Sequence, residues 1–84
     1  MRESYAIDVE FTADSLIVSL DDGRTISAPL EWFPRLRTAS PEVRAQWRLI
    51  GRGIGIHWDQ LDEDLSVRGL LEGARAVTPL TRAS

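Results

Sequence analysis

The chain has 84 residues, a formal net charge of −3 and no cysteine. This length accommodates one small domain, and the lack of cysteine excludes disulfides and thiolate metal sites. All ten basic residues are arginine, which excludes Schiff-base chemistry and a phosphate-binding Walker lysine. The negative net charge argues against a domain that binds nucleic acid over its whole surface, because such domains are usually basic.

No apolar run approaches the roughly 18–20 residues of a transmembrane helix. The N-terminal stretch M-R-E-S-Y-A-I-D-V-E carries acids where a signal peptide has a continuous apolar segment. We therefore expect a cytoplasmic protein that makes no contact with a membrane.

The first thirty residues predict an antiparallel three-stranded meander. The first strand shows period-two alternation over residues 5–12, and its inward side chains are expected to be Tyr5, Ile7, Val9 and Phe11. A second run alternates through Leu16, Val18 and Leu20, and a third has Ile26 and Ala28 inward. Asp22-Gly23 lies between these two runs and is a strong hairpin signal, because the turn needs positive φ angles.

Pro29 is expected to end the third strand, since proline cannot donate to a ladder. The segment Leu30–Leu36 is predicted to be a short helical turn or an irregular stretch that packs Trp32 or Phe33 on the sheet.

A helix is predicted to begin at Pro41, with Ser40 as its N-cap. Val43 and Trp47, one turn apart, would form its buried side, and Arg44 and Arg48 would share an exposed side.

Residues 47–50 and 54–58 then predict a second hairpin with Ile54, Ile56 and Trp58 in the core. Ser66 is expected to cap a helix from Val67 to about Glu72, with Gly73 as its left-handed stop. The chain is thus predicted to be a single α+β domain over residues 1–77: a three-stranded meander followed by a helix, a β-hairpin and a C-terminal helix. Residues 78–84 are expected to form a mobile tail.

The segment Gly53–Ser66 holds the only histidine, His57, and four acids within residues 59–64. An EF-hand starting at Asp62 would place Val67 and Gly73 where glycine and glutamate are required. A zinc site would need three or four ligands, and the chain offers one histidine, no cysteine and carboxylates. No serine lies in the sequence context of an activated nucleophile. The acids are expected to precede the last helix, where its dipole favours negative charge. We predict no catalytic residue, no metal and no cofactor. A small enzyme or metal-dependent protein centred on His57, Asp59 and Asp62 is kept as a further hypothesis, beside the two given at the end of this section.

The arginines are unevenly distributed. From Arg35 to Arg52 there are five arginines and a single acid, Glu42. This asymmetry is typical of a partner surface, or of internal pairing with the acids of residues 59–64.

Several motifs resemble those of the domain-of-unknown-function 2442 family of small bacterial proteins. They are D-G-R-T-I-S-A-P-L at 22–30, W-F-P-R-L at 32–36, A-S-P-E-V-R at 39–44, G-I-H-W at 55–58 and L-D-E-D-L-S-V-R-G-L-L-E-G at 61–73. The resemblance implies no established enzymatic activity and no assigned catalytic residues. It also implies an antitoxin-like role, since members are often encoded beside another small, toxin-like protein. Some relatives carry an added helix-turn-helix domain; this chain ends at Ser84, so autonomous DNA binding is not expected.

We therefore expect a protein-interaction module rather than an enzyme, in the form of the antitoxin-like component of a two-gene unit. Its expected partner is another small protein, and a homodimer is a further expectation from the small size. The alternative is a nucleic-acid-binding or regulatory module that uses the basic segment Arg35–Arg52. The candidate partner surface consists of Trp32, Arg35, Arg37, Arg44, Arg48, His57, Asp62, Glu63 and Asp64, with Trp32 as the strongest candidate.

Overall fold

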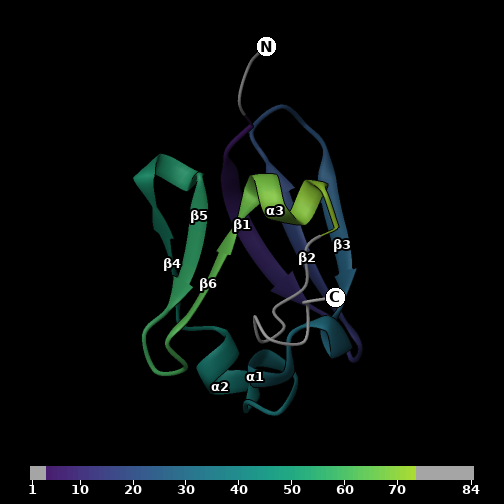
Figure 1. Cartoon of the computed structure of the whole chain (residues 1–84), viewed down its shortest axis with the longest axis vertical. Coiled ribbons are helices and arrows are strands. Elements are labelled where there is room, and N and C mark those ends of the chain that lie inside the picture. The colour runs from purple at the N-terminus through teal and green to yellow at the C-terminus, as the bar shows by residue number, and fades with distance from the viewer. Residues whose placement is uncertain (1–3, 74–84) are drawn as a thin grey trace, which may run out of the picture.

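Two three-stranded antiparallel sheets form the framework of the structure, a computed structural model that describes residues 4–73 (Figure 1). Sheet A has the order β1-β2-β3 and consists of β1 (Ala6–Phe11), β2 (Ser15–Leu20) and β3 (Thr25–Pro29). Sheet B has the order β4-β5-β6 and consists of β4 (Trp47–Ile50), β5 (Gly55–Trp58) and β6 (Glu63–Ser66). The α+β class predicted from the sequence is confirmed.

Short helical segments connect and cover the sheets. The 3-10 turn η1 (Leu30–Trp32), α1 (Pro34–Arg37) and α2 (Pro41–Arg44) join sheet A to sheet B at one end of the molecule (Figure 1). The 3-10 turn η2 (Gly51–Gly53) closes the β4–β5 hairpin, and α3 (Val67–Leu71) follows β6 and contacts β3.

The predicted meander is present, but the inward face of β1 differs from the prediction. A β-bulge between Ala6 and Asp8 places an extra residue, Ile7, in β1. Ala6 therefore pairs with Leu20 and is buried, whereas the side chain of Ile7 is 57% exposed. The expectation that Ile7 lies in the core is wrong, because a one-residue insertion reverses the side-chain alternation of a strand.

The core lies between the inner faces of the two sheets and the segment Leu30–Leu36. The most enclosed large side chains are Trp58, Phe33, Leu16, Leu20, Leu30, Leu36, Ile56 and Val18. The prediction that Trp32 or Phe33 packs on the sheet is thus confirmed through Phe33. Ile54, by contrast, was expected in the core and is 47% exposed, because it follows η2 at the hairpin tip and precedes β5.

The helix predicted at Pro41 forms, and the Ser40 hydroxyl accepts a hydrogen bond from the Val43 amide. It ends after one turn at Arg44, and Trp47 already begins β4. Val43 and Trp47 therefore do not form a helical buried side, and Arg44 and Arg48 do not share an exposed side. Pairing of β4 with β5 overrides the helical spacing of these residues.

Strand β6 was not predicted. Residues 63–66 were expected to lead into the last helix, and they instead pair with β5 in the register Trp58↔Glu63 to Gly55↔Ser66. The helix still begins where predicted, since the Ser66 hydroxyl accepts a hydrogen bond from the Gly69 amide. Gly73 follows the helix with φ +82°, in the expected left-handed conformation.

The predicted mobile tail, residues 78–84, and the last residues of the predicted domain lie outside the described residues. Within residues 4–73, no helix has the length and apolar character needed to cross a membrane.

Candidate functional site

Strand β6 separates the acids of residues 59–64 between two environments. Asp62 and Asp64 are exposed, whereas Glu63 is only 8% exposed and points to the same side as the buried Leu65. Burial raises the pKa of the Glu63 carboxyl, with the neighbouring Arg35 opposing this effect. The acids were expected to lie together before the N-terminus of the last helix, and this expectation is wrong because residues 63–66 form β6.

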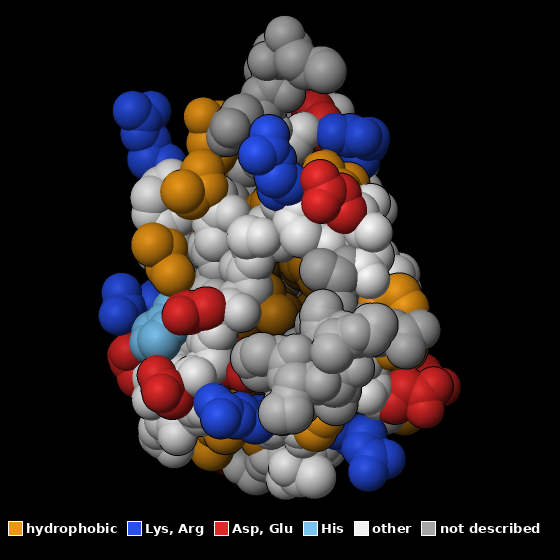
Figure 2. Space-filling model, in the orientation of Figure 1, with side chains coloured by type: hydrophobic (Ala, Val, Ile, Leu, Met, Phe, Trp, Pro, Cys, Tyr) orange, Lys and Arg blue, Asp and Glu red, His pale blue; other side chains and the backbone are white. Residues whose placement is uncertain are grey.

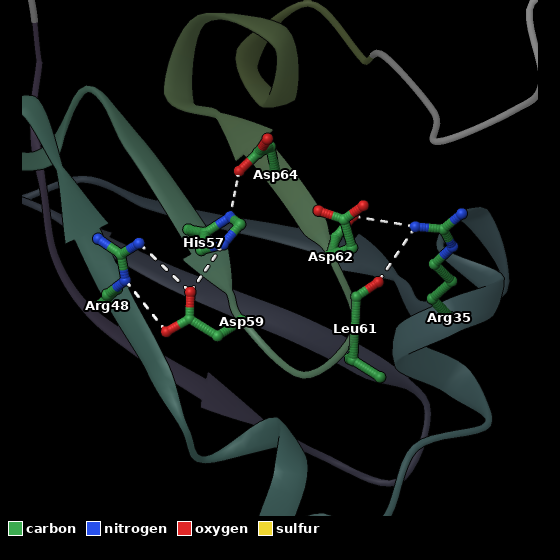
Figure 3. A network of polar contacts seen from close by, with 7 residues as sticks. All are labelled: Arg35, Arg48, His57, Asp59, Leu61, Asp62 and Asp64. Atoms are coloured by element: carbon green, nitrogen blue, oxygen red, sulfur yellow. Dashed lines mark hydrogen bonds and ion pairs between the residues drawn. The ribbon is translucent and has the colours of Figure 1, made fainter.

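A polar cluster instead crosses the outer face of sheet B (Figure 3). Strand register places Arg48 opposite His57 and His57 opposite Asp64, so the three residues form a row across β4, β5 and β6. His57 Nδ1 contacts Asp64 Oδ1, and His57 Nε2 lies 2.9 Å from Asp59 Oδ1. The Arg48 guanidinium lies 3.3 Å from both carboxylate oxygens of Asp59.

The contacts of this cluster shift the acidity of its members. The hydrogen bond that His57 donates to Asp64 raises the pKa of His57, and the charge of Asp59 adds to this effect, while burial and Arg48 oppose it. The Arg48 guanidinium lowers the pKa of Asp59. The cluster therefore favours a charged imidazolium held between two carboxylates.

Of the hypothetical centre of His57, Asp59 and Asp62, the structure brings His57 and Asp59 into contact and leaves Asp62 in the β5–β6 turn beside Arg35 (Figure 3). Both imidazole nitrogens already contact the carboxylates of Asp59 and Asp64 (Figure 3). No group of three or more histidine, aspartate and glutamate side chains within residues 4–73 could hold a metal ion. In the described structure this cluster joins three strands and presents charge on the surface.

Two of the predicted interface arginines instead support the backbone. Arg35 Nη1 donates to the carbonyls of Leu61 and Asp62, at 3.1 and 2.9 Å, and fixes the β5–β6 turn (Figure 3). Arg44 donates from Nε to Leu36 O and from Nη2 to Arg37 O, each at 2.8 Å. These guanidinium groups hold connecting segments in place.

The remaining candidates lie elsewhere. Trp32 is half-buried against the core, edge-to-face with Phe33 at a centroid distance of 6.4 Å. Arg37 is exposed on α1 and lines a shallow hollow with Asp14 and Glu31. The nine predicted residues therefore come from η1, α1, α2, the strands of sheet B and the β5–β6 turn.

Sequence reasoning missed the exposure of three isoleucines, two at the tip of the β4–β5 hairpin of sheet B and one in the β1 bulge of sheet A. Ile7, Ile50 and Ile54 are 57%, 38% and 47% exposed, and we refer to them as the tip isoleucines. Ile50 and Ile54 flank η2, and the Ile54 amide donates to the Ile50 carbonyl at 3.1 Å. Ile7 lies in the β1 bulge next to Ala6, whose backbone contacts Gly53 of η2. Hydrophobic side chains gather over this end of the β4–β5 hairpin in Figure 2.

These features define a small α+β domain of two three-stranded sheets with a charged cluster on one sheet and an apolar hairpin tip. The chain belongs to the family described as Protein of unknown function (DUF2442), whose model matches residues 6–76. The resemblance inferred from the sequence motifs is thus confirmed.

Two solved structures share this fold. A crystal structure of a protein of unknown function from Rhodospirillum rubrum is 30% identical, covers 92% of this chain and 95% of its own, and has a TM-score of 0.77. A solution structure of an uncharacterized protein from Chromobacterium violaceum is 22% identical, covers 94% of this chain and 74% of its own, and has a TM-score of 0.76. At 22% identity, the similarity to the Chromobacterium violaceum protein shows a shared fold and nothing further.

A curated match is to part of a larger protein. Cytidylate kinase from Clostridium perfringens is 39% identical over 54 residues, which is 61% of this chain and 25% of the kinase. The chain therefore spans about a quarter of the length of the curated relatives that it matches.

Proposed function

We propose that this domain is a protein-interaction module that binds another small protein, in the manner of the antitoxin-like component of a two-gene unit. The observation that carries the proposal is the group of tip isoleucines. Single exposed apolar residues are ordinary on a protein surface, but an apolar group gathered in one place is typical of an interaction site.

The backbone around the tip supports this proposal because it holds the isoleucines in fixed positions. The Ile54 carbonyl accepts from the Val67 amide at 3.0 Å, and Gly53 rests on the backbone of β1. A partner would therefore meet a prearranged surface and lose little conformational entropy in the loop on binding. Covering the tip isoleucines would contribute about 25 cal/mol for each Å² of apolar surface removed from water.

The match to part of a cytidylate kinase supports a module that also occurs within a longer chain. Phosphate transfer is not part of the proposal, since this chain contains no lysine for a phosphate-binding loop.

The test is co-expression of the chain with the product of the neighbouring reading frame, followed by size-exclusion chromatography with light scattering. We expect a stoichiometric complex that Ile54→Ser weakens at least about tenfold, equivalent to about 1.4 kcal/mol. Leu71→Ser is the matched control, because Leu71 is also 47% exposed but lies on α3. Circular dichroism would confirm that both variants fold.

If Ile54→Ser and Leu71→Ser weaken the complex equally, the tip isoleucines are not part of the interface. A chain that elutes alone at all concentrations would contradict the proposed function itself.

A further inference from the structure

A groove of about 600 Å³ runs between β1 and the α2–β4 segment. One wall is formed by consecutive residues from Val9 to Ala13, and the other by Pro41, Arg44, Ala45 and Trp47. Successive side chains of a strand point to opposite faces. Because consecutive residues of β1 line the groove, it runs along the edge of the strand rather than over one face of the sheet.

The free edge of β1 presents backbone hydrogen-bonding groups to this groove. The Thr12 amide donates to the Ser15 carbonyl at 2.9 Å, and the ladder continues with Phe11 opposite Leu16 and Val9 opposite Val18. In an antiparallel pair, hydrogen-bonded and non-hydrogen-bonded positions alternate. The Val9 and Phe11 amides and carbonyls therefore point away from β2.

The groove exists because β1 and β4 do not pair. The two strands belong to different sheets, and they approach each other near η2, where Gly53 contacts Ala6. They diverge toward the α2 end of the molecule (Figure 1). Within residues 4–73, the edge of β1 thus has no strand paired with it where the groove lies.

The side chains around the edge define what would fit there. On the inner side, the floor contains Phe11 and Trp47, and the Arg44 guanidinium lies 5.6 Å from the Phe11 ring centroid. The hydrogen bonds from Arg44 to the carbonyls of Leu36 and Arg37 hold its guanidinium in this position. On the outer side, Asp8 and Glu10 pair with Ser19 and Ile17, so two carboxylates project beside the free edge.

We propose that this groove binds an extended segment of a partner protein, which adds a strand to β1 and alternates apolar residues with lysine or arginine. Apolar side chains of the segment lie on Phe11 and Trp47, and its basic side chains lie beside Asp8 and Glu10. Cross-strand pairs of opposite charge stabilise such an arrangement. This inference rests on the proposed function and names a surface and a partner chemistry for it.

The test uses a nine-residue peptide that alternates valine with lysine, added to the full chain and followed by amide NMR and hydrogen exchange. We expect saturable shifts at Val9, Phe11 and the Trp47 indole, and slower exchange of the Val9 and Phe11 amides. A peptide of the same sequence, N-methylated at alternate residues on its pairing edge, keeps the side chains but cannot pair with β1. It is expected to bind at least tenfold more weakly (about 1.4 kcal/mol).

Charge reversal gives a second measurement. Glu10→Arg is expected to weaken peptide binding about tenfold, whereas Glu72→Arg, an exposed acid at the end of α3, is expected to leave it unchanged. Equal binding of the valine–lysine and valine–glutamate peptides, or unchanged exchange at Val9 and Phe11, would overturn the inference. A free chain that is dimeric and that Glu10→Arg makes monomeric would assign the groove to a second copy instead.

The two proposals can fail separately. A stable complex with the neighbouring gene product that the peptide does not compete with, and that tolerates Glu10→Arg, would leave the interaction module standing and remove the groove as its contact.

Discussion

Gly53, at the tip of the β4–β5 hairpin, lies directly against the backbone of Ala6 in β1. A Cβ atom at Gly53 would stand 3.0 Å from the Ala6 nitrogen and closer still to its carbonyl oxygen. Gly53 also has φ +109°, a conformation that side chains strongly disfavour. Since no ladder joins the two sheets in the described part of the chain, this contact is one of the points that hold sheet B against sheet A.

Gly53→Ala is therefore expected to destabilise the fold by about 2–4 kcal/mol, the sum of a backbone clash and an unfavourable φ. Urea denaturation followed by tryptophan fluorescence would measure the loss. Gly23→Ala is the matched control, because Gly23 has φ +94° but no atom within 4 Å of the added Cβ. Similar losses for the two variants would show that the contact with Ala6 adds nothing.

The two serine caps give a second prediction. Both Ser66 and Ser40 accept a hydrogen bond from the backbone of the helix that they precede. Ser66→Ala is expected to lower the free energy of unfolding by about 1 kcal/mol. Ser40→Ala should have a smaller effect, because α3 buries Val67 and Leu70 whereas α2 buries no residue. Equal losses for the two variants in thermal denaturation would mean that the stabilisation by a cap does not depend on how many residues its helix buries.

Much of sheet A, the second hairpin and both caps could be predicted because their signals are local. Asp22-Gly23 marks a turn within a few residues of the strands that it joins, and Ser66 caps the helix that follows it. The β1 bulge has no comparable signal: its alternation is regular in the sequence, and the extra residue is visible only once Ala6 pairs with Leu20.

The candidate site was harder to predict because it depends on β6. Glu63 and Leu65 point inward and Asp64 and Ser66 outward, a period-two pattern that the nearby helix cap obscured. The contact between His57 and Asp64 arises only from pairing of β5 with β6. Ile7 and Ile54 were assigned to the core because apolar residues usually are buried, and only the bulge and the hairpin tip expose them.

Arg35 and Arg37 lie two residues apart on α1 and allow a third prediction. Arg35→Gln removes a charged donor from the carbonyls of Leu61 and Asp62 and should lower the free energy of unfolding by about 1 kcal/mol. Arg37→Gln should be near neutral, since its exposed side chain makes no hydrogen bond or ion pair within residues 4–73. Chemical denaturation of both variants would check this. A larger loss of unfolding free energy for Arg37→Gln than for Arg35→Gln would mean that the hydrogen bonds of Arg35 do not stabilise the fold.

His57 gives the last prediction, which concerns pH. Its pKa in the folded chain is raised by Asp64, so it lies above the value of about 6.5 expected in the unfolded chain. The folded state therefore binds the proton more tightly. The resulting stabilisation is fully present below the unfolded pKa and is lost as pH rises through the folded pKa.

The melting temperature is thus expected to fall between about pH 6.5 and the folded pKa of His57, which can be read from the titration of the single histidine by NMR. His57→Gln should abolish this dependence, and Asp64→Asn should lower the folded pKa of His57, because the hydrogen bond from His57 to Asp64 is the largest cause of the shift. Asp21→Asn, in the β2–β3 turn and without a contact to His57, is the control for general charge removal. A histidine that titrates below its unfolded value would mean that burial outweighs the two carboxylates at this site.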